Sequence, residues 1–427
     1  MNSETVGPRN FVESIDRWAM GAILGLLVVS LVTLYSVTHA PVPEGVSNAL
    51  EVGTGIFWRQ IVWVTIGLAA FAAGYVAPTR LIEATVWVQY GIVLALLVLV
   101  LSMPHRAGAE RWIILGPLQF QPSEPAKATI IFLLARLLAQ RERPIAGLRD
   151  LLLPLLIVLP PFALILKQPD LGTGLVFVAI TIPMLFWAGM RLSHVLLLTS
   201  PLLSIFLHLY CRARGWNPLW VWIGMVVAVA AVLIWRRRNR WESIAILGAN
   251  LGVRLLEGAL WGRLHEYQQR RITTFFSPDF DTLGQGYHVT QSKIAVGSGG
   301  VLGKGFLAGT QKELAFLPAR HTDFIFSVIG EEFGYIGALC VLALFGILLV
   351  RGLRYATRAR NRFARYVAFG IVAYISFQLM QNVGMTVGLF PVAGIPLPLV
   401  SYGGTSLLST LFLLGVLLGI GRRWREY

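Results

Sequence analysis

Carboxylates and glycines are concentrated in one polar stretch of this chain, from Arg263 to Asp323. Seven of the 21 acidic residues lie between Arg263 and Glu332. Within the stretch, Asp279 and Asp281 stand two positions apart among turn-forming residues. An aspartate held against apolar walls near a membrane can have a raised pKa and act as a general base. The alternative interpretation is a loop of Asx turns without a chemical role.

A second group of polar residues precedes a predicted helix far upstream of that stretch. Arg111 and Trp112 are followed by the polar segment from Gln121 to Lys127. Glu124 and Lys127 are three positions apart and therefore share one helix face at the end of an apolar run. The pattern fits either a binding site or a helix-start ion pair beside an interfacial tryptophan.

Two shorter patterns place a charge beside turn-forming or glycine-rich sequence. Asp170 follows a proline and precedes an apolar run, so capping of the next helix is the favoured interpretation on these residues alone. Lys304 ends a glycine-rich segment that begins at Gly297. That segment resembles a phosphate-binding nest, although its spacing is not that of a P-loop.

Further polar residues lie at or inside predicted membrane spans near the end of the chain. His321 and Asp323 precede a strongly apolar run, and Glu331 and Glu332 lie within it. Carboxylates at that depth are costly and usually face a cavity or a partner. Ser401 belongs to a segment rich in proline and glycine, whose irregular backbone needs cover from protein or water.

The composition of the chain is that of a polytopic membrane protein. Of its 427 residues 56% are hydrophobic and 13% are charged, against about 25% charged residues in a soluble domain. The net charge of +15 does not indicate nucleic-acid binding, because the basic residues cluster in short loops between apolar runs. Cys211 and Cys340 lie in or beside apolar runs, so no disulfide framework is expected. No zinc spacing, Walker sequence, dinucleotide fingerprint or nucleophile elbow is present.

The apolar runs predict an all-helical bundle of about twelve membrane spans. The predicted spans are Trp18–Val37, Phe57–Val76, Ile82–Met103, Ala126–Leu138, Leu151–Leu166, Leu171–Met190, Leu192–Cys211, Leu219–Trp235, Ile244–Trp261, Phe324–Val350, Phe363–Phe390 and Leu399–Ile420. The first run has no small-residue cleavage site, so we expect it to be a retained span.

The arginines predict the orientation of these spans. With the N-terminus in the cytoplasm, the arginine clusters at 141–149, 236–240, 351–365 and 422–425 all fall on the cytoplasmic side. The ninth span is the weakest because it contains Arg254 and Glu257. Without it the C-terminal arginines would face outward, so the charge pattern supports it. The stretch 263–323 then becomes a large extracytoplasmic loop.

Five segments carry a resemblance to a known family. They read GAERW…FQPSEPAK, QPDLGTG, LGQGYHVTQSKIAVGSGGVLGKG, FLPARHTDFIFSVIGEEFGYIG and GLFPVAGIPLPLVSYGGTS. In this order they resemble the SEDS family of polytopic membrane proteins. The segments QSKIAVGSGG and GTQKELAFLPARHTDFIF favour its elongation (RodA) type over its septal (FtsW) type.

The resemblance implies a peptidoglycan glycosyltransferase of the bacterial inner membrane that polymerises lipid II during cell elongation and releases undecaprenyl pyrophosphate. It assigns Asp281 as the general base, while cationic side chains stabilise the leaving pyrophosphate. The expected substrate-binding residues are Arg111, Trp112, Glu124, Lys127, Asp170, Lys304, His321, Asp323, Glu332 and Ser401. A divalent cation, magnesium or manganese, is an alternative source of positive charge, although no ligand set for it is visible. The implied partners are lipid II, a class B penicillin-binding protein transpeptidase and other elongasome membrane proteins.

The chain departs from the family pattern at one place, and two other functions remain open. The family usually has ten spans, so the segment 192–235 is expected to be an inserted transmembrane hairpin. A flippase for a polyprenyl-linked precursor would also have many spans, broken helices and buried carboxylates. It needs access from both faces, whereas the large outward loop favours chemistry on one face. The third interpretation is a non-catalytic scaffold for a transpeptidase.

Overall fold

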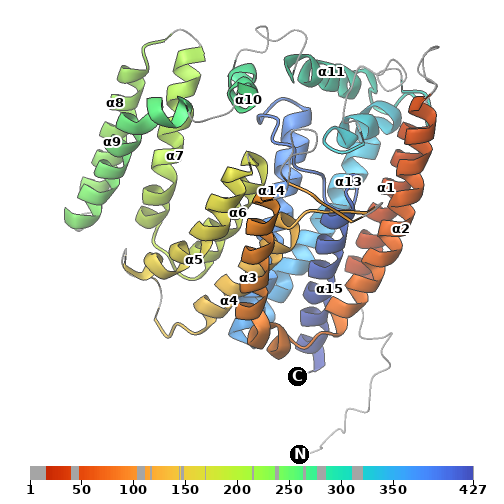
Figure 1. Ribbon diagram of the computed structural model, residues 1–427, viewed down its shortest axis with the longest axis horizontal. Coiled ribbons are helices and arrows are strands. Elements are labelled where there is room, and N and C mark those ends of the chain that lie inside the picture. The colour runs from red at the N-terminus through yellow and green to blue at the C-terminus, as the bar shows by residue number, and fades with distance from the viewer. Residues whose placement is uncertain are drawn as a thin grey trace, which may run out of the picture.

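The computed structural model describes the chain in twelve segments that contain most of its length. They are residues 16–39, 48–102, 111–115, 118–143, 145, 149–168, 170–213, 216–235, 240–262, 266–276, 285–309 and 321–426. Within them the chain is a bundle of long helices that run mostly along one direction (Figure 1). The polytopic helical fold expected from the apolar runs is therefore confirmed.

Each of the twelve predicted spans corresponds to one long helix among the described residues. These helices are α1 (Arg17–Thr38), α2 (Asn48–Val76), α3 (Thr79–Leu101), α4 (Ser123–Ala139), α5 (Arg149–Lys167), α6 (Leu171–Trp187), α7 (Leu192–Ala213), α8 (Pro218–Trp235), α9 (Arg240–Gly262), α13 (Ile325–Arg358), α14 (Arg362–Thr386) and α15 (Gly404–Glu426). In the described segments, eight of them are long and apolar enough to cross a membrane, and α6 and the first part of α7 are shorter apolar helices. The chain is thus a multi-pass membrane protein.

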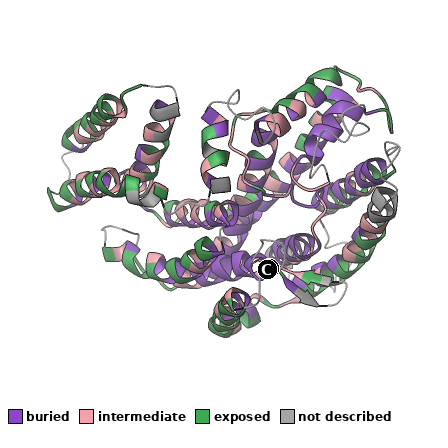
Figure 2. Ribbon diagram, turned by 45° about the horizontal axis from the view of Figure 1, so that its top comes forward, coloured by how far each residue is buried: buried purple, intermediate pink, exposed green. Residues whose placement is uncertain are grey.

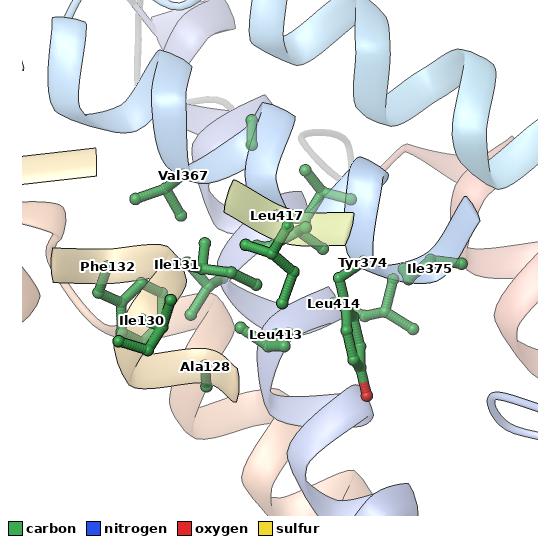
Figure 3. Packing of buried hydrophobic residues seen from close by; sticks show 14 of the residues in the cluster. Ala128, Ile130, Ile131, Phe132, Val367, Tyr374, Ile375, Leu413, Leu414 and Leu417 are labelled. Carbon is green, nitrogen blue, oxygen red and sulfur yellow. The ribbon is translucent and has the colours of Figure 1, made fainter. Parts of the chain in front are cut away.

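Helix α4 is short and less apolar because protein surrounds it instead of lipid. Its neighbours are α3, α6, α14 and α15, and nearly all of its residues are buried. Figure 3 shows Ile131 and Phe132 of α4 among buried side chains of α14 and α15. This central position lets the helix carry Glu124, Lys127 and Arg136, whose charges would be costly against lipid.

Close packing of α2 against α15 closes the other side of the core. A Cβ atom added at Gly415 would lie 2.1 Å from the carbonyl oxygen of Phe71, and one at Gly74 would lie 2.4 Å from that of Phe412. Small residues at such positions let two membrane helices approach closely enough for their backbones to touch. The pair α2 and α15 therefore behaves as one rigid wall of the bundle.

The first helix is tied to the end of α13 by a buried carboxylate. Asp16 caps α1 by accepting hydrogen bonds from the amides of Trp18 and Ala19, and it also accepts from Arg351 and Tyr355. Burial opposes ionisation of Asp16, but the hydrogen bonds from Tyr355 and Arg351 outweigh it and lower the pKa of its carboxyl. The start of α1 and the end of α13 consequently lie at the same end of the bundle.

Helices α7, α8 and α9 form a separate group at one edge of the molecule (Figures 1 and 2). In this group α7 packs against both α8 and α9, and polar contacts cross its interface. His194 Nε2 lies 3.2 Å from Glu242 Oε1, and Asn250 Nδ2 donates to Ser200 Oγ at 2.8 Å. The predicted hairpin 192–235 therefore has α9 as a third member. That the segment is an insertion stays a prediction.

The polar stretch 263–323 is partly helical. It contains α10 (Glu266–Phe276) and α11 (Gln285–Ser298), which lie together at the end of the bundle opposite the C-terminus (Figure 1). A short antiparallel hairpin, β1 (Ile113–Leu115) and β2 (Leu118–Phe120), leads into α4. Residues of this hairpin and beside it line a cavity between the helix ends.

Candidate functional site

A cavity of about 570 Å³ opens at the end of the bundle where α4 and α6 begin. Its lining comes from α2, the β-hairpin, the starts of α4 and α6, and the segments around residues 322 and 400. The lining residues are Arg59, Val62, Trp63, Arg111, Trp112, Gln119, Gln121, Glu124, Lys127, Asp170, Thr173, Val176, His321, Thr322, Asp323, Gly394, Ile395, Pro396, Tyr402, Gly403, Gly404 and Ser406. Seven of the ten predicted substrate-binding residues are among them.

The deepest charges of the cavity are Glu124 and Lys127. Lys127 Nζ donates to Glu124 Oε1 at 2.8 Å, and both side chains are almost fully buried, at 3% and 4% exposure. Pro122 and Pro125 fit the start of α4, where no helical partner exists for the first amides, and Glu124 faces the positive end of the helix dipole. Lys127 Nζ also lies 5.7 Å from the centre of the Tyr374 ring. Glu124 and Tyr374 thus hold the ammonium group of Lys127 at the buried end of the cavity.

Asp170 both caps a helix and lines the cavity. Its side chain accepts hydrogen bonds from the amide of Thr173 at 3.1 Å and from the Thr173 hydroxyl at 2.9 Å, so the capping interpretation is confirmed. Arg111 Nη1 lies 3.8 Å from Asp170 Oδ1, and Arg111 Nε donates to the carbonyl of Gln168 at 3.1 Å. Asp170 therefore holds the Arg111 guanidinium at the mouth of the cavity.

Asp323 and His321 form the opposite wall. The Tyr402 amide donates to the His321 carbonyl at 2.9 Å, and their rings lie 5.9 Å apart. Burial raises the pKa of the Asp323 carboxyl, and the positive charge of Arg271 on α10 only partly offsets it. A Cβ atom at Gly394 would lie 3.5 Å from Arg271 Nη1 and 3.7 Å from Asp323 Oδ2. Helix α10 thus reaches the rim of the cavity.

The raised pKa of Asp323 predicts a pH dependence of stability. The Asp323 carboxyl binds a proton more tightly in the folded state than in the unfolded state. The stability that this contributes is therefore fully present below the ordinary pKa of 3.8 and is lost as pH rises through the pKa of the folded state. We expect the wild-type unfolding temperature in detergent to fall with rising pH relative to that of Asp323→Asn. The free energy of unfolding of the wild type relative to the variant should change by at most about 1.4 kcal/mol per pH unit. Parallel pH profiles of the two proteins would contradict the shift.

Three predicted site residues lie outside this lining. Lys304 Nζ pairs with Glu331 Oε1 at 2.7 Å, and Glu332 Oε1 accepts from the Ser36 hydroxyl at 2.5 Å. Ser401 donates its hydroxyl to the Thr322 carbonyl at 2.5 Å, so it braces a wall of the cavity from behind. The structure therefore does not bring these side chains to the seven in the cavity.

The glycines before Lys304 pack against α13 at its kink. A Cβ atom at Gly303 would lie 2.1 Å from the Glu332 carbonyl, and the Lys304 amide donates to the Glu331 carbonyl at 3.0 Å. Gly334, inside α13, has φ of 63°, a backbone conformation that favours glycine. These contacts explain the glycine-rich pattern by close backbone approach instead of by a phosphate nest.

Asp281 lies outside the described residues. Of the loop that carries it, the structure describes only the flanking helices, with α10 ending at Phe276 and α11 beginning at Gln285. The assignment of Asp281 as the general base stays a prediction. The divalent cation also stays a prediction, since no cluster of three or more His, Cys, Asp or Glu side chains suited to a metal occurs in the described segments.

Sequence reasoning missed several lining residues, of which Arg59 carries the strongest chemistry. Arg59 is an exposed residue on α2 that reaches the cavity together with Trp63. Its position at the outer end of a predicted span contains a usable signal, because the positive-inside rule disfavours arginine there. Gln121 begins the polar segment identified in the sequence but was not among the expected substrate-binding residues; it also lines the cavity, and its side chain donates to Asp170 Oδ2 at 3.4 Å.

Together these observations define a class: a polytopic membrane protein with a charged, partly enclosed cavity at one end of its helix bundle. Comparison with known proteins identifies the family within that class. The model of the FtsW/RodA/SpoVE family, described as cell cycle protein, matches residues 17–218 and 220–426. The chain belongs to this family, which confirms the resemblance found in the sequence.

Relatives of both types are similar to the chain. The peptidoglycan glycosyltransferase MrdB of Escherichia coli K12 is 33% identical over 95% of this chain and 93% of its own length. The peptidoglycan glycosyltransferase RodA of Treponema pallidum is 31% identical over 96% of this chain and 98% of its own. A probable peptidoglycan glycosyltransferase FtsW of Geobacter metallireducens is 31% identical over 97% of both chains.

Solved structures have the same fold over almost the whole chain. One comes from a study of the structural coordination of polymerization and crosslinking by a peptidoglycan synthase complex. It has a TM-score of 0.69, is 31% identical and covers 97% of this chain and 99% of its own. The crystal structure of Thermus thermophilus rod shape determining protein RodA has a TM-score of 0.59, is 28% identical and covers 96% of this chain and 97% of its own.

Proposed function

We propose that this protein is a peptidoglycan glycosyltransferase that polymerises lipid II into glycan strands during cell elongation. The observation that carries the proposal is the cavity in which Arg59, Arg111 and Lys127 meet the carboxylates of Asp170 and Asp323. Full-length similarity to proteins named peptidoglycan glycosyltransferase supports it.

The reaction makes one bond and breaks another at a single carbon atom. The 4-hydroxyl oxygen of the acceptor sugar attacks the anomeric carbon of the donor, and the bond from that carbon to the pyrophosphate oxygen breaks. Asp281 takes the hydroxyl proton as general base. The departing pyrophosphate carries the electron pair of the broken bond and becomes undecaprenyl pyrophosphate, so atoms and charge balance.

The cations of the cavity are suited to the leaving group. Arg111 is partly exposed, at 25%, and is held by Asp170, so its guanidinium places a positive charge at the mouth of the cavity that suits a phosphate group. Lys127 supplies a point charge at the floor, already desolvated and therefore strong toward charge that develops in the transition state. Arg59 stands on a third element and completes a cationic rim.

We further propose the orientation and the partner. The arginine clusters between the apolar runs favour an orientation with both termini in the cytoplasm and the cavity on the outer face. A class B penicillin-binding protein transpeptidase, with other elongasome membrane proteins, would then crosslink the product outside the cell. A solved neighbour concerned with polymerization and crosslinking supports this pairing.

The test is polymerisation of purified lipid II by the purified protein in detergent, with and without the cognate transpeptidase. We expect one undecaprenyl pyrophosphate to be released for each glycosidic bond formed. Gel electrophoresis detects the glycan strands, and mass spectrometry detects the undecaprenyl pyrophosphate. Lipid II scrambling in liposomes without polymer would support the flippase interpretation instead. A protein that assembles with the transpeptidase but makes no polymer in either setting would support the scaffold interpretation. Preference for the septal over the elongation transpeptidase would indicate the FtsW type.

A further inference from the structure

A second, smaller cavity lies at the other ends of the helices that begin at the central cavity. It has a volume of about 220 Å³. Its lining residues are Leu138, Arg141, Glu142, Arg143, Ala188, Arg362, Arg365 and Tyr366. Lys127 and Leu138, which line the two cavities, lie about 17 Å apart along α4. The two cavities are therefore distinct sites at opposite ends of the bundle.

The small cavity has an excess of positive charge. Four guanidinium groups face it with one carboxylate, that of Glu142. Asp150 pairs with Arg141 from outside the lining. Among the described residues, the Nε of Arg141 is buried and has no hydrogen-bond partner. Guanidinium groups repel one another in so small a space unless an anion lies between them.

Helix capping explains only part of this arrangement. Arg362 Nη1 donates to the Arg141 carbonyl at 3.1 Å, and Arg365 Nη2 donates to the Ala359 carbonyl at 3.1 Å. These bonds satisfy backbone groups beyond the ends of α4 and α13. A guanidinium group has five donors, so each of these arginines retains others for a ligand. Arg143 is exposed and stands at the open side of the cavity.

Aromatic side chains mark the cavity as lying at the level of lipid headgroups. Ala188 follows Trp187, whose ring stacks on that of Phe369 at 4.3 Å. Phe369 is three positions after the lining residue Tyr366 and shares its helix face. Phe186 is 55% exposed next to them, as expected for a lipid contact. Tryptophan and tyrosine, here Trp187 and Tyr366, gather where acyl chains meet headgroups.

We propose that this cavity binds the phosphodiester of an anionic membrane lipid from the leaflet at this end of the bundle. Arginine pairs bidentately with phosphate, and basic pockets between membrane helices are known binding sites for anionic headgroups. The volume corresponds to about seven water molecules, enough for a phosphate and its ester oxygens. The acyl chains would then lie along the exposed face beside Phe186 and Trp187. The proposal does not depend on the reaction at the central cavity.

The test measures lipid retention by the full-length protein in native mass spectrometry, with phosphatidylglycerol, cardiolipin or phosphatidylcholine added. We expect the wild type to retain the two anionic lipids and to release phosphatidylcholine. The double variant Arg143→Gln and Arg362→Gln should lose about thirtyfold in affinity for the anionic lipids. The matched control is Arg354→Gln with Arg360→Gln, which removes the same charge from exposed positions outside the cavity.

Several results would overturn the proposal. Equal loss of anionic lipid in the double variant and in its control would indicate general attraction to the surface. Inorganic phosphate at millimolar concentration tests whether the ligand is a free anion. If it releases the bound lipid and, by itself, raises the unfolding temperature as much as the lipid does, the ligand is a free anion. Unfolding temperatures in lipid-free detergent check that the double variant folds. Should it not fold, Arg143→Gln alone serves, because Arg143 lies in an exposed bend and is expected to lose about fivefold.

Discussion

Replacing Lys127 with methionine is expected to abolish glycan polymerisation and to destabilise the protein. The substitution leaves the Glu124 carboxylate buried, with 4% exposure and without the ammonium that lies 2.8 Å from it. Breaking a buried pair in this way costs about 3–5 kcal/mol. Thermal unfolding in detergent measures the stability, and the lipid II assay measures the activity.

A double variant separates the structural role of this pair from its chemical role. Glu124→Met with Lys127→Met replaces the pair by apolar side chains of similar volume, and such replacements are often neutral or stabilising. We expect its unfolding temperature to return close to that of the wild type while polymerisation stays absent, because the desolvated cation that Lys127 supplies to the pyrophosphate is gone. Recovery of polymerisation together with stability would show that the pair only holds α4 in place.

The contrast between Lys127 and Lys304 shows what a sequence pattern can and cannot predict. Both lysines were expected to bind the substrate, and both are paired with glutamate in the structure. Lys127 lies in the lining of the central cavity, and Lys304 does not. The difference arises from the packing of the glycine-rich segment against the kink of α13, a contact between residues about thirty positions apart. Local spacing does not contain that information.

Helix positions are far easier to predict than contacts between helices. The apolar runs predict the twelve long helices of the described segments, because the length of a span is fixed by the thickness of the bilayer. The grouping of α9 with α7 and α8 depends instead on polar contacts such as that of His194 with Glu242. Those two residues lie in separate predicted elements, and the sequence of neither element indicates that the two are in contact.

In the candidate site, too, the residues could be predicted more easily than the contacts between them. Seven lining residues could be found because they stand in polar segments between or at the ends of the apolar runs. Arg59 lies near the start of the predicted span Phe57–Val76, and only its positive charge on the expected outer side distinguishes it from an ordinary span boundary. The pairing of Arg111 with Asp170 joins the β-hairpin region to the start of α6 and depends on tertiary packing. The sequence therefore predicts the composition of the cavity better than its internal contacts.

Replacing Asp281 with asparagine is expected to have the largest effect on the chemical step alone. The amide cannot accept the proton of the sugar hydroxyl, so the rate of polymerisation should fall by about 10²–10⁴-fold. Binding of lipid II should persist, because the cations of the cavity are unchanged. Single-turnover measurement of undecaprenyl pyrophosphate release gives the rate, and lipid II retention in native mass spectrometry gives the binding.

Asp279→Asn is the matched control, since it makes the same change of charge two positions away in the same loop. It should polymerise at close to the wild-type rate. If Asp279→Asn is as inactive as Asp281→Asn, the loop contributes to the reaction through its total charge. Asp281 is then not singled out as the general base. If Asp281→Asn keeps a near wild-type rate, the base is another carboxylate. Asp323 would then be the first candidate, because it lines the cavity and burial raises the pKa of its carboxyl, which makes its carboxylate a stronger base.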